Sequence, residues 1–138
     1  TGLGKTYLLN AVAKEALGHG KTVIYTTARD LFAAIEKEKF HKTEETENFS
    51  VSENIGAADL FILDDLGTEF NTMLTSSELF NIINSRMNNK KSTVISTNLS
   101  PKDLVSSYSD RVVSRILGSY RILKFFGEDI RLKKKFGK

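Results

Sequence analysis

The start of the chain restricts its fold more than any other feature, because it matches most of a phosphate-binding loop. The first six residues, Thr-Gly-Leu-Gly-Lys-Thr, fit the last six positions of the pattern G-x-x-x-x-G-K-[ST]. In such a loop, backbone N–H groups surround nucleotide phosphates, the lysine reaches the β- and γ-phosphates, and the hydroxyl ligates Mg²⁺. We therefore expect Mg²⁺ at Thr6, and ATP at a segment made of Thr1, Gly2, Leu3, Gly4, Lys5, Thr6 and Tyr7.

The complete pattern has a further glycine, which would precede Thr1 by two residues. A loop of this kind follows a buried strand, so we expect that first strand and an N-terminal region to be missing from this fragment. The missing part would carry several phosphate-facing N–H donors. We therefore expect the 138 residues alone to bind nucleotide poorly, with weak or no activity.

The composition is that of one ordinary globular domain, spanning residues 1–138. Apolar residues make up 40% of the chain and charged residues 27%, and there is no cysteine. The lack of cysteine excludes a disulfide framework and a thiolate metal site. No apolar run approaches the roughly 20 residues needed to span a bilayer. We expect a cytoplasmic protein that makes no membrane contact.

Hydrophobic periodicity predicts helices that alternate with strands. Helices are expected at 6–17, 29–39, 76–87 and 108–117, with short ones within 40–54 and from Pro101; strands are expected at 22–27, 60–63, 92–96 and 120–126. This alternation predicts an α/β fold of three αβα layers around a mainly parallel sheet. Ligands of such sheets bind beyond the carboxyl ends of the strands.

Two aspartates follow the apolar strand Leu60–Leu63 and could complete a nucleotide-hydrolysing site. Asp64 is expected to bind Mg²⁺, mostly through its water ligands, and Asp65 to orient or deprotonate the attacking water. The plain alternative for this pair is two solvated loop residues. Glu69 could assist the base, contact a neighbouring subunit, or lie on the surface.

Further candidates come after the later strands. Asn98 could hold the attacking water against the γ-phosphate, although an asparagine after a strand more often belongs to a turn. Arg111 and Arg115 are four residues apart and share one helix face. Either could stabilise a transferring phosphoryl group from a neighbouring subunit, or be a solvated side chain. The basic tail, which includes Arg131, is a solvated end or a nucleic-acid contact.

These segments together resemble the AAA+ ATPases of the bacterial helicase-loader group, which includes DnaC, DnaI and the transposase helper IstB. Thr1–Asn10 resembles their Walker A segment, Leu63–Glu69 their Walker B segment, and Ser96–Asn98 their sensor 1. The resemblance implies that Arg115 is the arginine finger, with Arg111 as the alternative, and that Arg131 is the sensor 2 residue.

The resemblance implies an ATPase module of a replicative helicase loader, acting in DNA replication as a homo-oligomer whose arginine finger reaches the neighbouring subunit. Its partners would be single-stranded DNA and a replicative helicase, the latter bound through the absent N-terminal region. An IstB-like transposase helper is the alternative within the family. Alternatives of other classes are a small-molecule P-loop kinase and an ATP-gated DNA-binding module with negligible turnover.

Overall fold

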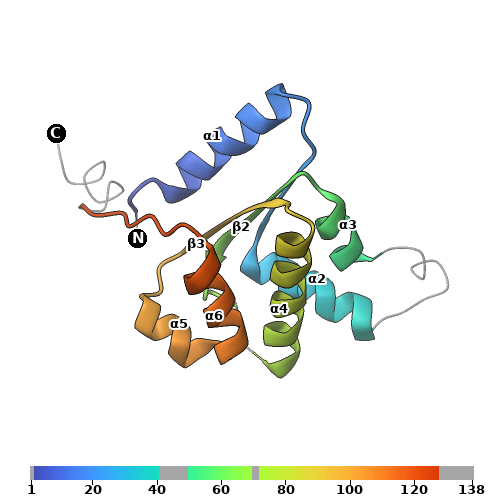
Figure 1. Cartoon of the computed structure of the whole chain (residues 1–138), viewed down its shortest axis with the longest axis vertical. Coiled ribbons are helices and arrows are strands. Elements are labelled where there is room, and N and C mark those ends of the chain that lie inside the picture. Colours follow the sequence, from blue (N-terminus) through green and yellow to red (C-terminus); the bar gives the residue numbers. More distant parts are fainter. Residues whose placement is uncertain (1, 41–49, 70–71, 128–138) are drawn as a thin grey trace.

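The computed structural model describes residues 2–40, 50–69 and 72–127 (Figure 1). Helices and strands alternate along the chain as the periodicity predicts. In order they are α1 (Lys5–Gly18), β1 (Val23–Thr27), α2 (Ala28–Phe40), α3 (Val51–Ala57), β2 (Leu60–Leu66), α4 (Met73–Asn88), β3 (Ser92–Thr97), α5 (Pro101–Ser107) and α6 (Asp110–Ser119). No helix within these residues is long and apolar enough to cross a membrane.

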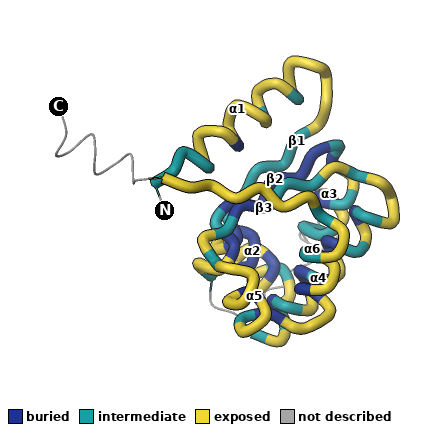
Figure 2. The backbone as a smooth tube through the Cα atoms, turned by 60° about the vertical axis from the view of Figure 1, so that its left-hand side comes forward, coloured by how far each residue is buried: buried dark blue, intermediate teal, exposed yellow. Residues whose placement is uncertain are grey.

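The three strands form a parallel sheet in the order β1-β2-β3, with β2 at its centre. Helix α1 packs on one face against β1 and β2, whereas α2 and α4 pack on the strands from the other face. Figure 2 shows α1 on one side of the strands and the other helices on the opposite side. The expected three-layer α/β fold with a parallel sheet is therefore confirmed.

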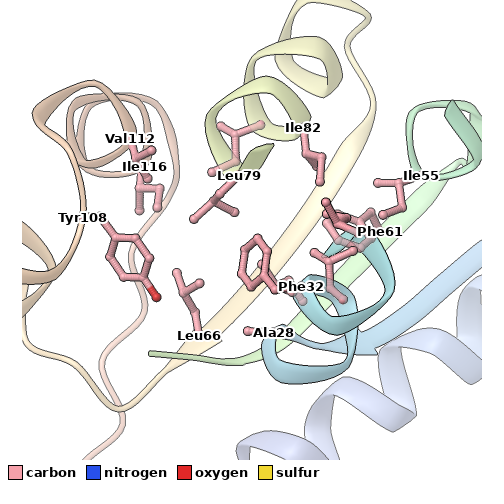
Figure 3. Packing of buried hydrophobic residues seen from close by; sticks show 14 of the residues in the cluster. Ala28, Phe32, Ile55, Phe61, Leu66, Leu79, Ile82, Tyr108, Val112 and Ile116 are labelled. Carbon is pink, nitrogen blue, oxygen red and sulfur yellow. The ribbon is translucent and has the colours of Figure 1, made fainter. Parts of the chain in front are cut away.

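Side-chain alternation along β2 divides the apolar core into two clusters. Phe61 and Leu63 point into the larger cluster, which α2, α3, α4 and α6 complete (Figure 3). Leu60 and Ile62 point to the other face, where Leu9 of α1 covers them. Because both faces of β2 are covered, its apolar residues form a continuous run in the sequence.

Arg86 of α4 is fully buried and ties the amino ends of β2 and β3 to α3. Its guanidinium donates to the backbone carbonyls of Ile55, Ala58, Asp59 and Ser92 and to the Thr93 hydroxyl. It also lies 5.8 Å from the centroid of the Phe61 ring. A buried arginine is tolerated here because backbone carbonyls satisfy its donors.

Three local expectations need correction. The segment 120–126 is not a strand, because β3 pairs only with β2 and no described strand lies beside this segment to complete its hydrogen bonds. The helix expected at 108–117 begins only at Asp110, since Tyr108 and Ser109 are extended and the Ser109 hydroxyl caps α6. The short helix expected within 40–54 is α3, which starts at Val51 and ends later, at Ala57.

Candidate functional site

The loop before α1 has the backbone shape that phosphate binding requires. Gly2 and Gly4 have φ angles of 67° and 82°, in the left-handed region that favours glycine. Gly4 is the N-cap of α1, and no side chain caps this helix end. The first N–H groups of α1 therefore remain available, and the helix dipole adds partial positive charge beside them.

The loop meets the end of β3 through a lysine. The Lys5 ammonium group donates a hydrogen bond to Asn98 Oδ1 at 2.9 Å. These residues are 93 positions apart in the sequence, and the fold brings them together at the carboxyl end of the sheet. This is the edge at which a parallel sheet is expected to bind its ligand.

Asp64 receives hydrogen bonds from three hydroxyl groups. Thr6 Oγ1 and the Tyr25 hydroxyl donate to Asp64 Oδ2 at 3.0 and 2.7 Å, and the Ser96 hydroxyl donates to Oδ1. The Asp64 side chain is 3% exposed. Thr6 and Asp64, the two expected Mg²⁺ ligands, are therefore in direct contact.

Side-chain alternation explains how neighbouring strands deliver these groups to one place. Residues 60, 62 and 64 of β2 share a face, as do residues 23 and 25 of β1 and residues 94 and 96 of β3. The apolar members of these sets pack in the cluster beneath α1. The polar members lie on the same face, further along the strands, where α1 begins.

The hydroxyl groups also determine how Asp64 and Tyr25 ionise. Burial alone would raise the pKa of Asp64, but hydrogen bonds from Ser96, Tyr25 and Thr6 outweigh it and hold the pKa below its usual range. Burial, together with the hydrogen bond to Asp64, raises the pKa of Tyr25 well above its ordinary value. Asp64 is therefore an anion near neutral pH, and Tyr25 remains a hydroxyl donor.

Asp65 departs from regular strand geometry. Its φ is 55°, and the β2–β3 register is irregular between Leu63 and Leu66. Regular alternation would put Asp65 on the opposite face from Asp64, so this irregularity changes the direction that its side chain takes. Among the described residues, its carboxylate makes no hydrogen bond or ion pair, while its N–H donates to Ser96 Oγ at 2.9 Å.

The described donor set fits ATP and Mg²⁺. Magnesium is commonly bound by one or two protein oxygen ligands together with water and substrate phosphates. Thr6 and Asp64 supply such a pair, with the Lys5 ammonium group on the same edge of the sheet. Within the described ranges, no cluster of three or more His, Cys, Asp or Glu residues provides an all-protein metal cage.

The arginines lie apart from this cluster. Arg111 and Arg115 are exposed on α6, which packs on α4 on the face opposite α1. The Arg111 guanidinium stacks 4.3 Å from the centroid of the Phe80 ring. Arg115 makes no hydrogen bond or ion pair with the rest of the described chain. Thr1 and Arg131 lie outside the described residues. Leu3 lies within the loop, between Gly2 and Gly4, and Tyr7 is in the first turn of α1, where it is 83% exposed.

Sequence patterns alone missed the roles of Tyr25 and Ser96. The available signal was a tyrosine in the middle of a half-buried strand, two residues after Val23 and therefore on the same face of the sheet as Val23. Glu69, for which the sequence left three roles open, has hydrogen-bond partners within its own chain. It accepts hydrogen bonds from the Gly67 N–H and the Tyr108 hydroxyl of the same chain.

Known proteins are similar to this chain in sequence and in fold. The family model described as IstB-like ATP binding protein matches residues 1–137. The chromosomal replication initiator protein DnaA of Mesoplasma florum is 32% identical over 115 residues, which are 83% of this chain and 26% of that protein. The replicative helicase loader DnaC of Buchnera aphidicola subsp. Acyrthosiphon pisum is 27% identical over 131 residues, 94% of this chain and 53% of that protein. The chain thus spans between about a quarter and about half of these relatives.

Solved structures agree with the sequence relatives. A crystal structure of the DnaC helicase loader has a TM-score of 0.77 and 27% identity, covering 91% of this chain and 73% of that one. AMPPCP-bound DnaA from Aquifex aeolicus has a TM-score of 0.74 and 32% identity, covering 88% and 37%. DnaA bound to AMPPCP and single-stranded DNA has a TM-score of 0.72 and 33% identity, covering 86% and 35%. These neighbours are P-loop domains of the AAA+ type.

Proposed function

The chain belongs to the family of IstB-like ATP binding proteins, and from that membership together with its DnaC relatives we propose that it is the ATP-hydrolysing module of a replicative helicase loader. One observation carries the hydrolytic part of this proposal. Lys5 and Thr6 of the phosphate loop contact Asn98 and Asp64 at the carboxyl ends of β3 and β2. The groups proposed for phosphate binding and for hydrolysis are therefore neighbours at one edge of the sheet, which supports the proposal.

In the proposed reaction, the loop N–H groups and Lys5 bind the β- and γ-phosphates. Mg²⁺ held at Thr6 and Asp64 would neutralise charge on these phosphates. Asn98 orients the attacking water, and the Asp65 carboxylate takes one of its protons as the water oxygen bonds to the γ-phosphorus and the bond to the β–γ bridging oxygen breaks. The products are ADP and inorganic phosphate. The carboxylate of Asp65 suits this role, because it makes no hydrogen bond or ion pair with any described residue and so can accept a proton from water.

Arg115 would complete the site of a neighbouring subunit. It is exposed on α6, whereas Arg111 is stacked on Phe80 of its own chain, and this difference supports Arg115 as the finger. An arginine supplied in trans stabilises charge on the transferring phosphoryl and increases turnover by about 10³–10⁵-fold in related systems. Arg131 is proposed as the sensor 2 arginine on the resemblance of its segment.

Mixing defective subunits of the full-length protein tests both the hydrolysis and the shared site. Lys5→Ala subunits lack a working phosphate site but keep Arg115, and Arg115→Ala subunits have the opposite defect. Each variant alone should release little phosphate from ATP. The mixture should regain part of the activity, because some interfaces pair an intact Lys5 with an intact Arg115. A mixture as inactive as its components would contradict the trans arrangement.

The helicase partnership is proposed from the DnaC relatives, and single-stranded DNA from the DnaA structure that holds it. The family name favours one competitor, an ATPase that assists a transposase. A loading assay separates the two. The full-length protein with ATP should deposit a hexameric replicative helicase on circular single-stranded DNA, and Lys5→Ala should not. ATP-dependent stimulation of a transposase, without helicase loading, would support the competitor.

A further inference from the structure

The last two residues of β2 and the three that follow it, 65–69, form a turn directly after Asp64, here called the catalytic turn. The Thr68 N–H and hydroxyl both donate to the Asp65 carbonyl oxygen, at 3.3 and 2.8 Å. Gly67 has a φ of 102°, and a Cβ atom added to it would lie 2.6 Å from Leu99 Cδ1. The turn is therefore compact and packs closely against the residue that follows Asn98.

The carboxylate of Glu69 fastens this turn at its far end. One oxygen accepts the Gly67 N–H at 2.8 Å, and the other accepts the Tyr108 hydroxyl. Hydrogen bonds to an ionised carboxylate are stronger than those between neutral groups. Glu69 thus links the backbone of the catalytic turn to a side chain 39 residues further along the chain.

Tyr108 is a rigid anchor for this link. It ends α5 and is 6% exposed, with its ring in the large core cluster beside Leu66 and Ile116 (Figure 3). Burial and the hydrogen bond to Glu69 raise the pKa of Tyr108 well above its ordinary value. Its hydroxyl therefore stays protonated and remains a donor to Glu69.

We propose that Glu69 and Tyr108 are positioning residues that hold the catalytic turn, and through it the carboxylate of Asp65, in the geometry needed for hydrolysis. The inference rests on the proposed role of Asp65 as the base. Asp65 is held by its backbone at Ser96 and Thr68, while its carboxylate has no described partner. Its direction therefore depends on the shape of the turn, which the Glu69–Tyr108 contact fixes.

Loss of this contact should affect the chemical step more than nucleotide binding. In the described structure, the side chains of Lys5, Thr6 and Asp64 make no hydrogen bond to Glu69 or Tyr108. A change in the turn would therefore misplace the base while the phosphate site persists. In kinetic terms, kcat falls and KM stays constant.

The experiment compares Tyr108→Phe with the full-length protein in steady-state ATP hydrolysis. Phenylalanine keeps the buried ring and removes only the hydroxyl. We expect kcat to fall about five- to tenfold, with KM and the affinity for a fluorescent non-hydrolysable ATP analogue unchanged within about twofold. Ser106→Ala is the matched control, because it removes a hydroxyl that bonds only within α5, to the Lys102 carbonyl.

A double-mutant cycle tests whether the two residues act as a unit. Glu69→Ala should lower kcat at least as much as Tyr108→Phe, and combining the two should lower it no further. Glu69→Gln should be intermediate, because the two donors use different carboxylate oxygens and the amide replaces one of these oxygens by an NH₂ group that cannot accept. Additive losses of kcat would contradict a shared role.

The remaining outcomes each decide the question. If the unaltered protein hydrolyses ATP and kcat is unchanged in Tyr108→Phe, the positioning role is overturned and the proposed function is not affected. A loss of kcat accompanied by equal losses of analogue binding and thermal stability would overturn it in favour of a purely structural contact. If the unaltered protein releases no phosphate, the proposed function fails, and the inference fails with it.

Discussion

The Lys5 ammonium group and the Asn98 amide oxygen lie 2.9 Å apart, joined by a hydrogen bond. The contact connects the first residue of α1 with the residue that follows β3. The lysine of a phosphate-binding loop reaches the β- and γ-phosphates of the nucleotide. The proposed role of Asn98 also requires Asn98 to lie near the γ-phosphate. The contact therefore fits the proposal that Lys5 and Asn98 act on one phosphoryl group.

Asn98→Ala should therefore slow hydrolysis more than it weakens ATP binding. We expect kcat to fall about 10- to 100-fold, because a group that orients water or developing charge acts mainly in the transition state. KM should change little. Steady-state phosphate release by the full-length protein measures both. Asn89→Ala, at the exposed C-cap of α4, is the matched control. A similar fall in kcat in Asn89→Ala would contradict a specific role of Asn98.

Tyr25→Phe should weaken the coupling between Mg²⁺ and nucleotide. The Tyr25 hydroxyl donates to the same Asp64 oxygen as Thr6, so its loss frees the carboxylate to rotate away from the proposed metal position. We expect the Mg²⁺ concentration for half-maximal ATP binding to rise about tenfold, at the lower end of the roughly 10–100-fold effects that follow loss of outer partners of metal ligands. Isothermal titration over a Mg²⁺ series measures it.

The same series in the absence of Mg²⁺ is the internal control for Tyr25→Phe. Metal-free ATP binding should match that of the unaltered protein. If it falls by the same factor, Tyr25 supports the loop itself and not the carboxylate.

The low pKa of Asp64 predicts a specific acid sensitivity. Burial opposes its ionisation, but the hydroxyl donors outweigh burial, so the folded carboxyl binds a proton less readily than the unfolded one. Its contribution to stability is complete above the unfolded value of about 4 and is lost as pH falls through the lower folded pKa. Urea unfolding from about pH 5 to 2.5 should show a shallower decline for Asp64→Asn than for the unaltered protein.

Asp103→Asn provides the comparison for that experiment, because it removes an exposed carboxylate from α5. It should retain the slope of the unaltered protein. Equal slopes for Asp64→Asn and the unaltered protein would contradict the depressed pKa of Asp64.

Arg86→Met should destabilise the fold strongly. Methionine fills much of the same space but leaves the carbonyls of Ile55, Ala58 and Ser92 without their buried donor. Unsatisfied buried groups cost about 1–3 kcal/mol each, partly relieved by water, so we expect a loss of about 3–5 kcal/mol in the free energy of unfolding. Denaturant unfolding measures it, and exposed Arg29→Met should change it by less than about 0.5 kcal/mol.

Much of the fold followed from the sequence because its signals are local. The helix after the phosphate loop has helical periodicity, and the short continuous apolar run of β2 is typical of a strand that is covered on both faces. The segment 120–126 misled for the opposite reason. Its apolar residues suit a strand, but a strand also requires a neighbour, and the described sheet ends at β3.

The site was predictable where residue type alone indicates chemistry, as for Lys5, Thr6 and Asp64. Their contacts confirm that these residues converge, while their catalytic roles remain predictions. Tyr25 and Tyr108 could not be found in this way. In a hydrophobic pattern, a tyrosine counts as an apolar residue. Whether its hydroxyl reaches a carboxylate depends on the register of a neighbouring strand for Tyr25, and on the packing of a helix distant in sequence for Tyr108.

The buried guanidinium of Arg86 secures the sheet at the end away from the nucleotide site. It holds the segments that lead into β2 and β3, whereas Asp64 and Ser96 stand near the opposite ends of these strands. The hydrogen bonds of Arg86 and the candidate site at Asp64 and Ser96 therefore lie at opposite ends of the same strands. Substitutions of exposed residues around the phosphate loop should therefore cost less folding free energy than substitutions around Arg86, so the candidate site can vary in sequence while the fold is retained.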